Sequence, residues 1–308
     1  MTSSISPTSE IFLANLQQIE NRISTAEEQL SSGLAVNQAS DDPDEISSIL
    51  MLRAQIAGVQ QTQQNLSTVS PQVNSAENAI QQAIQALDTA TSLATAASGS
   101  TSSAAQQALM VPQVQGILQQ LLSLSQTSVN GQFIFNGNQS DQASYCYTLN
   151  AQGTGVTPPA VQPGPPGQIM DPNGIPISTG LTAYEVFDGG DGGANQPQDS
   201  AFNAVSSLLT ALQNNDSAGI QAALTNIQTA SAYMNGESSF YGAAQNSITA
   251  ANNTGSTLLT QLQQQLSNEQ DADAAQVSED LQSALTDEQA AMSAQAEYKP
   301  QTLFSYLS

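Results

Sequence analysis

Apolar residues recur at every seventh position between residues 52 and 94 of this 308-residue chain. The strip contains, without a miss, Leu52, Val59, Leu66, Val73, Ile80, Leu87 and Ala94. A strict seven-residue repeat is typical of a coiled-coil seam. It predicts one long helix over about residues 43–98, roughly 80 Å in length at about 1.5 Å per residue. Because the flanking seam positions Gln63, Ser70 and Glu77 are polar, a lone helix of this kind would not persist in water, so helical partners are expected.

A second seam lies close to the N-terminus. Its apolar residues follow one another in steps of four and three, and they are Phe12, Leu16, Ile19, Ile23, Ala26 and Leu30. Ser6-Pro7 offers a cap followed by proline at the first helical position, and Gly33 offers a C-terminal stop. These signals predict a helix that begins at Pro7 and ends just before Gly33.

The segment Asp41-Asp42-Pro43 marks the start of the long helix. Asp42 can cap the helix, Pro43 then stands at the first helical position, and Glu45 can complete a capping box. The acidic side chains also lie at the positive end of the helix dipole. An alternative interpretation is that Asp41 and Asp42 form a general acid/base pair. We favour capping, because a helix must start here. Within the long helix, Pro71 is expected to cause a local kink.

The C-terminal part of the chain returns to a helical pattern from Phe202 onwards. Breaks are expected near Asn214-Asn215 and Asn235-Gly236. Apolar positions skip eleven residues between Leu266 and Val277. An eleven-residue step relaxes a left-handed supercoil, so it predicts a straighter stretch of helix.

The middle of the chain has a different texture. A helix is expected over residues 104–129, and residues 130–199 then contain most of the Pro and Gly. Short runs at residues 132–135 and 184–187 predict strands, and residues 151–176 predict an irregular loop.

We therefore expect three domains. A terminal helical assembly domain takes residues 1–42 and 266–308, a helical rod takes 43–129 and 200–265, and a small β-rich outer domain takes 130–199. The expected fold class is mainly α, an elongated rod of long coiled-coil-like helices from both chain ends with a small inserted β-rich domain.

Charge restricts the possible partners. Three basic residues against 26 acidic ones give a net charge of −23, although only 9% of residues are charged. Nucleic-acid binding needs clustered cations, which this chain lacks, so no nucleic-acid partner is expected. An anionic membrane surface is disfavoured for the same reason. No apolar run is long enough for a membrane span, and the first thirty residues show no conventional secretory signal.

The chain is poor in groups that carry chemistry. It has no His and a single Cys, so the usual nucleophile–base arrangements and nitrogen or sulfur metal sites are excluded. Cys146 is expected to be a small apolar side chain rather than a reactive thiol. Residues 188–193 form an Asp-Gly-Gly-Asp-Gly-Gly run that offers oxygen ligands to calcium, but it lacks the EF-hand order, so a flexible surface turn is favoured. We expect neither an enzyme nor a bound cofactor or metal.

Both ends of the chain carry familiar motifs. The segments are Gln29-Leu30-Ser31-Ser32-Gly33-Leu34, then Asn37-Gln38-Ala39-Ser40-Asp41-Asp42-Pro43, then Leu52-Arg53-Ala54-Gln55-Ile56, and at the other end Tyr298 with Leu303-Phe304-Ser305-Tyr306-Leu307. Together they resemble the N-terminal and C-terminal signatures of the bacterial flagellin family. The run Asn130-Gly131-Gln132-Phe133-Ile134-Phe135-Asn136-Gly137 and the Leu-Phe-Ser-Tyr-Leu ending resemble the corresponding segments of those members that join the hook to the filament.

The resemblance implies a structural protein of the bacterial flagellum. Such a protein is exported without a cleaved signal peptide, through the flagellar type III apparatus, and works outside the cell. Its implied partners are further copies of itself in a ring, a neighbouring hook-associated protein, flagellin, and an export chaperone that binds the C-terminal helix. The terminal assembly residues carry over to Phe12, Leu16, Ile19, Ile23, Leu30, Leu303, Phe304 and Leu307. Two alternatives remain, a filament flagellin subunit and, more remotely, a secreted hydrolase that uses Asp188 or Asp191.

Overall fold

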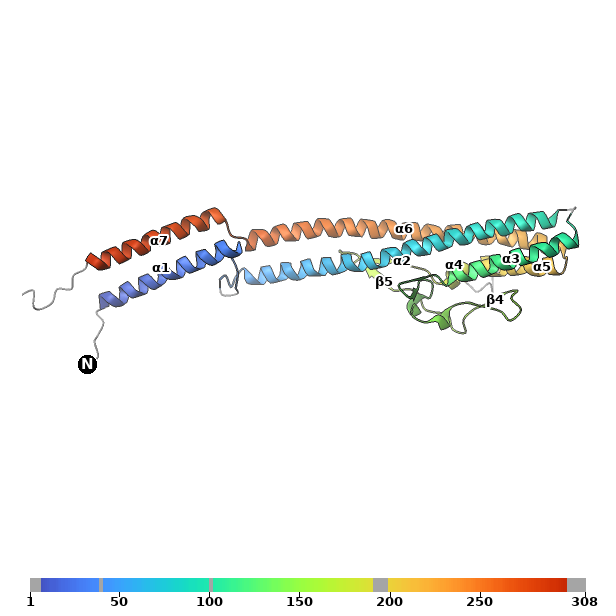
Figure 1. The fold of residues 1–308 in the computed structure, drawn as a ribbon, viewed down its shortest axis with the longest axis horizontal. Coiled ribbons are helices and arrows are strands. Elements are labelled where there is room, and N and C mark those ends of the chain that lie inside the picture. Colours follow the sequence, from blue (N-terminus) through green and yellow to red (C-terminus); the bar gives the residue numbers. More distant parts are fainter. Residues whose placement is uncertain (1–6, 39–40, 100–101, 191–198, 298–308) are drawn as a thin grey trace, which may run out of the picture. The chain divides into compact units, whose positions relative to one another are not determined.

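The computed structural model describes residues 7–38, 41–99, 102–190 and 199–297. The chain is mainly α, with long helices from both ends and a small insert that contains strands, as the sequence predicts (Figure 1). It divides into two compact units. We call residues 1–58 with 258–308 the terminal unit, and residues 59–257 the central unit. The finer division into three domains stays a prediction.

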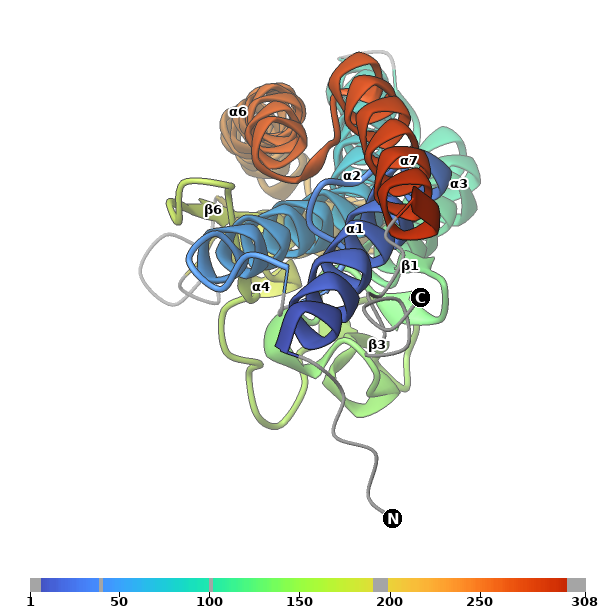
Figure 2. The same ribbon diagram turned by 90° about the vertical axis from the view of Figure 1, so that its left-hand side faces the viewer.

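The terminal unit is built around two helices, α1 (Pro7–Ser32) and α7 (Ala274–Glu297). They lie side by side and run in opposite directions (Figures 1 and 2). Gly33 ends α1 with a positive φ of 74°, and its N–H donates to the carbonyl of Gln29 at 2.8 Å. Here the predicted stop is confirmed, because glycine adopts this conformation without a Cβ clash.

A short backbone bridge closes the terminal unit where α1 and α7 meet the long helices. The N–H of Ala35 donates to the carbonyl of Gln270 at 2.7 Å, and the N–H of Ala272 donates to that of Gly33 at 2.9 Å. The same unit contains the first residues of α2 (Ile46–Ser98) and the last residues of α6 (Ser217–Gln270). Both connections between short and long helices are therefore held together.

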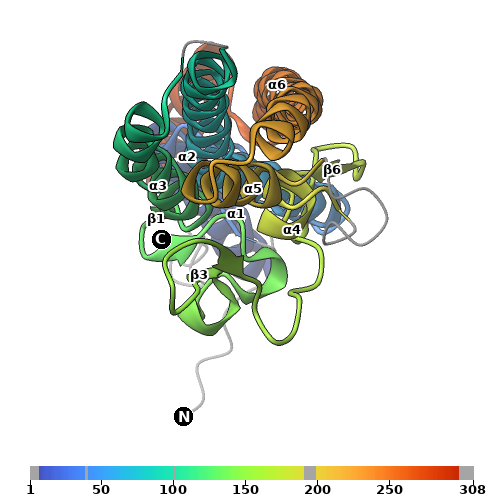
Figure 3. The same cartoon turned by 90° about the vertical axis from the view of Figure 1, so that its right-hand side faces the viewer.

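The central unit contains the remaining parts of α2 and α6 together with α3 (Ala104–Ser125) and α5 (Ala201–Gln213). Side chains link α2 to α6 at two levels. Gln63 donates to Ser256 Oγ at 3.1 Å, and Gln245 donates to the carboxylate of Glu77. Figure 3 shows α3 and α5 side by side below these long helices. All seven residues of the heptad strip are buried, and the five from Leu66 to Ala94 belong to the hydrophobic core of the central unit.

The strand-containing segment follows α3. Among the described residues it forms three antiparallel pairs, namely β1 (Ser128–Val129) with β2 (Gln132–Phe133), β3 (Thr148–Leu149) with β4 (Val156–Thr157), and β5 (Gln168–Met170) with β6 (Pro176–Ser178). Two 3-10 turns, Gly137–Gln139 and Ala143–Tyr145, lie between them. The expected strand over residues 132–135 ends at Phe133. Positive φ angles at Asn130 and Gly131, 54° and 79°, make the tight turn that joins β1 to β2.

Aromatic side chains join this segment to the helices. Phe187 makes an edge-to-face contact with Phe135 at 5.3 Å between ring centroids, and it stacks on Phe202 of α5 at 5.8 Å. The ring centroid of Tyr147 lies 5.1 Å from that of Phe202. Each such pair contributes about 0.5–1.5 kcal/mol beyond its burial, so the small insert shares one core with the helices.

The expected strand at residues 184–187 is wrong. These residues form the short helix α4 (Ala183–Phe187), whose N-cap is Thr182. The Thr182 hydroxyl accepts a hydrogen bond from the N–H of Glu185, and the Glu185 carboxylate accepts one from the N–H of Thr182 at 2.7 Å. This reciprocal capping box outweighs the strand preference of Tyr, Val and Phe.

Two expectations about the returning helices need correction. The break predicted at Asn235-Gly236 is absent, because α6 continues through both residues. The eleven-residue step does not mark a straighter helix. It spans the end of α6 at Gln270 and the start of α7, where Asp273 accepts the N–H of Ala275 at 2.9 Å. The predicted break at Asn214-Asn215 is present, since α5 ends at Gln213 and Asn215 has a φ of 52°.

The long helix α2 is continuous from Ile46 to Ser98, and Pro71 lies inside it. None of the helices within the described residues carries the apolar stretch that a bilayer crossing requires.

Candidate assembly surface

The seam side chains of α1 are only partly buried. Phe12, Leu16, Ile19 and Ile23 are each half-buried, and Ala26 is buried. Helix α7 is the element that α1 contacts most, and it contributes its own buried positions Val277 and Ala284. The seam residues of α1 therefore pack against α7 within the same chain. A pair of helices is too thin to enclose its apolar side chains, so part of the seam stays in contact with solvent.

Further apolar side chains of the terminal unit are largely exposed. The members of this set come from α1, α2 and α7, and they are Ile11, Leu13, Leu30, Leu50, Met51, Leu285 and Met292. Their exposed fractions run from 38% at Leu30 to 61% at Ile11. Seven of the eleven large apolar side chains that are exposed among the described residues therefore lie in the terminal unit.

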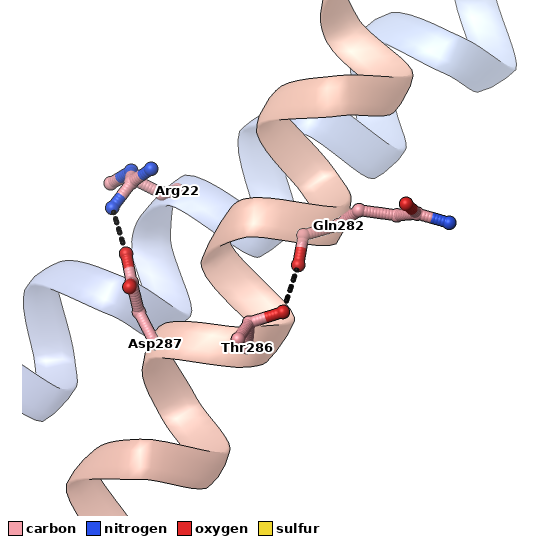
Figure 4. A network of polar contacts seen from close by, with 4 residues as sticks. All are labelled: Arg22, Gln282, Thr286 and Asp287. Carbon is pink, nitrogen blue, oxygen red and sulfur yellow. Dashed lines mark hydrogen bonds and ion pairs between the residues drawn. The ribbon is translucent and has the colours of Figure 1, made fainter.

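Figure 4 shows the ion pair that links the two terminal helices. Arg22 Nη1 of α1 lies 3.0 Å from Asp287 Oδ2 of α7. Nearby, the hydroxyl of Thr286 donates to the carbonyl of Gln282 within α7 at 2.8 Å. The two charged side chains are 46% and 51% exposed, so the pair contributes at most about 1 kcal/mol. The pair joins one turn of α1 to one turn of α7.

The two carboxylates of the acidic motif before α2, Asp41 and Asp42, accept hydrogen bonds from backbone N–H groups. Asp42 Oδ1 accepts the N–H groups of Asp44 at 3.0 Å and Glu45 at 3.1 Å, which is the pattern of an N-cap. Asp41 Oδ2 accepts the N–H groups of Asn37 at 2.9 Å and Gln38 at 2.7 Å.

Pro43 follows this cap, ahead of the first regular helical residue, Ile46, whose N–H donates to the carbonyl of Asp42. Both carboxylates thus hold backbone in the connection between α1 and α2. The alternative of a catalytic pair gains no support from this geometry.

The predicted C-terminal assembly residues Leu303, Phe304 and Leu307 lie outside the described residues. Their role stays a prediction.

The central unit contains a buried carboxylate that the sequence did not reveal. Asp188 is 7% exposed. Ser200 Oγ donates to its Oδ1 at 2.6 Å, and the hydroxyl of Tyr147 donates to its Oδ2 at 3.2 Å. Burial and then the Asp188 charge raise the pKa of Tyr147 well above its usual range. The expectation of a flexible surface turn is therefore wrong at Asp188, while Asp191 lies outside the described residues.

The pKa values of two other titratable groups near α4, Tyr233 and Glu237, are also raised. The hydroxyl of Tyr233 donates to the carbonyl of Glu185 at 2.6 Å, and burial together with nearby carboxylates raises the pKa of Tyr233 to about 12. Burial, followed by the charge of Glu185, raises the pKa of Glu237.

Burial also raises the pKa of the Cys146 thiol, which is buried beside the Asn136 amide at 3.4 Å. The thiol therefore stays protonated, as expected of a packing residue. Within the described residues, no group of three or more His, Cys, Asp or Glu side chains is arranged to hold a metal ion.

Comparisons with known proteins agree with the motifs at the N-terminus. Residues 7–140 match the family model of the bacterial flagellin N-terminal helical region. A solved structure of a protein assigned as flagellar hook-associated, from Vibrio parahaemolyticus, superposes with a TM-score of 0.64 at 17% identity, covering 75% of this chain and 100% of that one. The crystal structure of FlgL from Bacillus cereus gives a TM-score of 0.48 at 15% identity, covering 67% and 98%. No curated protein sequence matches the chain.

These comparisons differ in what they establish. The match over residues 7–140 shows that the chain carries a flagellin N-terminal helical region, which includes α1 and all of α2. The similarity to the Vibrio protein shows a shared fold. The TM-score of the FlgL comparison is too low to support a conclusion about this chain.

Proposed function

We propose that this chain is a structural subunit of the bacterial flagellum that joins the hook to the filament, in the manner of hook-associated protein 3. The observation that carries the proposal is the flagellin N-terminal helical region at residues 7–140. The fold shared with a protein assigned as flagellar hook-associated supports the choice of a junction role. The similarity of residues 130–137 to the junction members of the family adds to that choice.

Subunits assemble into a ring through the terminal helices. The half-buried seam side chains Phe12, Leu16, Ile19 and Ile23, with Leu30 at 38% exposure, support this part of the proposal. When subunits meet, burial of this residual apolar area stabilises the assembly by about 25 cal/mol per Å². Leu303, Phe304 and Leu307 complete the surface at the other end of the chain.

The proposed partners are other copies of this chain, a neighbouring hook-associated protein, flagellin, and an export chaperone bound to the C-terminal helix. The protein leaves the cell through the flagellar type III apparatus without a cleaved signal peptide and works outside it. With three cations against 26 anions, the chain has no basic patch for a nucleic acid. Its family is structural, and we propose no enzymatic activity.

A filament flagellin subunit is the second candidate, because the matched helical region is named for flagellin itself. Deleting the gene separates the two. Loss of a junction protein leaves normal hooks while filament monomer escapes into the medium, whereas loss of a filament subunit leaves no monomer to escape. Culture supernatants and electron micrographs measure both. A deletion strain that swims normally with attached filaments would exclude both roles.

A further inference from the structure

Asparagine is followed directly by glycine at four places in the chain, at residues 130–131, 136–137, 173–174 and 235–236. In such a pair the backbone nitrogen of the glycine attacks the side-chain carbonyl carbon of the asparagine, because glycine has no Cβ to obstruct the approach. The attack requires an asparagine side chain that is free to turn and a glycine N–H that is not engaged in a hydrogen bond. All four pairs have the same chemistry, so only their surroundings distinguish them.

Two of the pairs are held in place by their surroundings. Asn136 is 1% exposed, and its Nδ2 donates to the carbonyl of Gln142 at 2.9 Å. Asn235 lies inside α6, where its Nδ2 donates to the carbonyl of Ser231 at 2.8 Å, and the N–H of Gly236 belongs to the hydrogen-bonded ladder of the helix. At both positions the reaction therefore requires the core or the helix to open locally.

The third pair is exposed, but its backbone is engaged. Asn173 and Gly174 lie in the turn between β5 and β6. The N–H of Gly174 donates to the carbonyl of Asp171 at 3.0 Å, and Asp171 Oδ1 accepts the N–H groups of Asn173 at 2.8 Å and Ile175 at 2.7 Å. The attacking nitrogen must therefore first leave a hydrogen bond, in a turn that the Asp171 carboxylate holds together.

The fourth pair is free of such contacts. Asn130 and Gly131 are both exposed, and they form the two-residue turn between β1 and β2, outside the paired positions Val129 and Gln132. Within the part of the chain that the structure describes, the Asn130 side chain and the Gly131 N–H make no hydrogen bond. Both requirements of the attack are thus met at this pair alone among the four.

We propose that Asn130 is the position at which the folded chain deamidates. The Gly131 nitrogen loses its proton to solvent and bonds to Cγ of Asn130, and Nδ2 leaves as ammonia. Water then opens the resulting succinimide ring at either of its two carbonyl carbons. Opening at Cγ produces aspartate, and opening at the main-chain carbonyl produces isoaspartate. Water is the only co-reactant, and no atom is oxidised or reduced. The inference is independent of the proposed function, because it concerns the chain alone.

The two products have different consequences for the β1–β2 hairpin. Both add a carboxylate to residues 89–140, where the unmodified chain has no charged residue. Aspartate keeps the length of the turn. Isoaspartate adds a carbon atom to the main chain of the turn, and the register of a hairpin depends on the length of its turn. We therefore expect isoaspartate, and not aspartate, to loosen the pairing of Val129 with Gln132.

The test incubates the purified full-length chain in mildly alkaline buffer and follows the four asparagines by peptide mass spectrometry. Asn130 is expected to react fastest. Asn173 should react roughly fivefold more slowly, because one exposed hydrogen bond must break first. Asn136 and Asn235 should react at least about 100-fold more slowly, because they require local unfolding. The same chain unfolded in urea is the reference, and there the four rates are expected to become similar.

Two variants test the causes. D171A removes the carboxylate that holds the β5–β6 turn, so it should raise the rate at Asn173 toward that of Asn130 and leave Asn130 unchanged. N130D supplies the aspartate product without isoaspartate. Its hairpin amides should keep their protection from hydrogen exchange, whereas chains that contain isoaspartate, separated by chromatography, should lose it. Circular dichroism checks that both variants fold.

Four outcomes overturn the inference. They are a folded chain in which any of the other three asparagines reacts faster than Asn130, a folded chain in which Asn130 stays intact while it reacts in urea, the same order of rates with and without urea, and a D171A chain in which the rate at Asn173 does not change. The third outcome would mean that flanking sequence, and not structure, sets the order.

Discussion

The terminal and central units draw on the same two long helices but bury their apolar side chains to different extents. In the central unit Leu87 of α2 and Leu118 of α3 are fully buried, and helices and strands enclose them. In the terminal unit Leu16 and Ile23 of α1 are only half-buried. The central unit therefore completes its core within one chain. Among the described residues, the terminal unit leaves part of its apolar area in contact with solvent.

Charge follows the same division. All three basic residues and sixteen of the 26 acidic ones fall in the terminal unit, which leaves ten acidic residues and no basic one in the longer central unit. Among the described residues, the ion pair of Arg22 with Asp287 lies within the terminal unit. Amide hydrogen bonds such as Gln63 to Ser256 take its place in the central unit.

The largest expected effect comes from cutting away part of the terminal unit. Removing residues 1–30, or residues 280–308, should abolish assembly completely and leave a soluble chain with a folded central unit. The reason is that the partly exposed helices are lost while the enclosed core stays intact. Sedimentation velocity measures assembly, and thermal melting followed by circular dichroism measures the fold. Assembly that survives both cuts would refute the assignment of the terminal helices.

Truncating a leucine to alanine should cost more unfolding free energy in the central unit than in the terminal unit. Leu118→Ala empties a fully buried position and is expected to cost about 2–5 kcal/mol of unfolding free energy. Leu16→Ala, at a half-buried position, is expected to cost about 1 kcal/mol and to weaken assembly instead. Urea unfolding of the unassembled chain measures both. Equal losses at the two positions would show that the terminal unit is packed as tightly as the central one.

Acidification should stabilise the central unit. Burial and the Glu185 charge raise the folded-state pKa of Glu237 above its ordinary value of 4.5. Its stabilising contribution is therefore fully present below the unfolded pKa and is lost as the pH rises through the folded one. We expect the melting temperature to increase as the pH falls from neutral toward about 4.5.

The matched variant Glu237→Gln should flatten this pH dependence, because the amide stays neutral throughout. A melting temperature that falls steadily on acidification, and equally in both chains, would contradict the argument.

Signals that lie close together in the sequence predicted the fold well. The heptad strip found the buried face of α2, and Gly33 found the end of α1, because each depends on local helix geometry. The misread segment at residues 184–187 also carried a local signal, the Thr182 to Glu185 capping box, but its aromatic and branched residues favoured a strand.

The buried site at Asp188 had no such signal. Its partner Tyr147 lies 41 residues earlier in the chain, so only tertiary packing brings the two together. The exposure of Leu109 on α3 could not be predicted from the sequence either. A leucine in a helix has the same sequence pattern whether its side is covered or open. The terminal seam was visible from its spacing, but its incomplete burial against α7 could be seen only in the structure.

The smallest expected effect tests whether packing or charge sets the register of the terminal unit. Arg22→Ala removes the one ion pair that links α1 to α7 among the described residues, and it should cost less than about 1 kcal/mol because both side chains are about half exposed. Hydrogen exchange of α1 amides measures the loss, and salt should shrink it because ions screen exposed charges. Arg53→Ala, which removes a cation of the same unit on α2, is the control and should leave α1 exchange unchanged. A much larger loss for Arg22→Ala would mean that charge rather than the half-buried seam holds the terminal helices together, and the contrast between the two units would then lie in electrostatics.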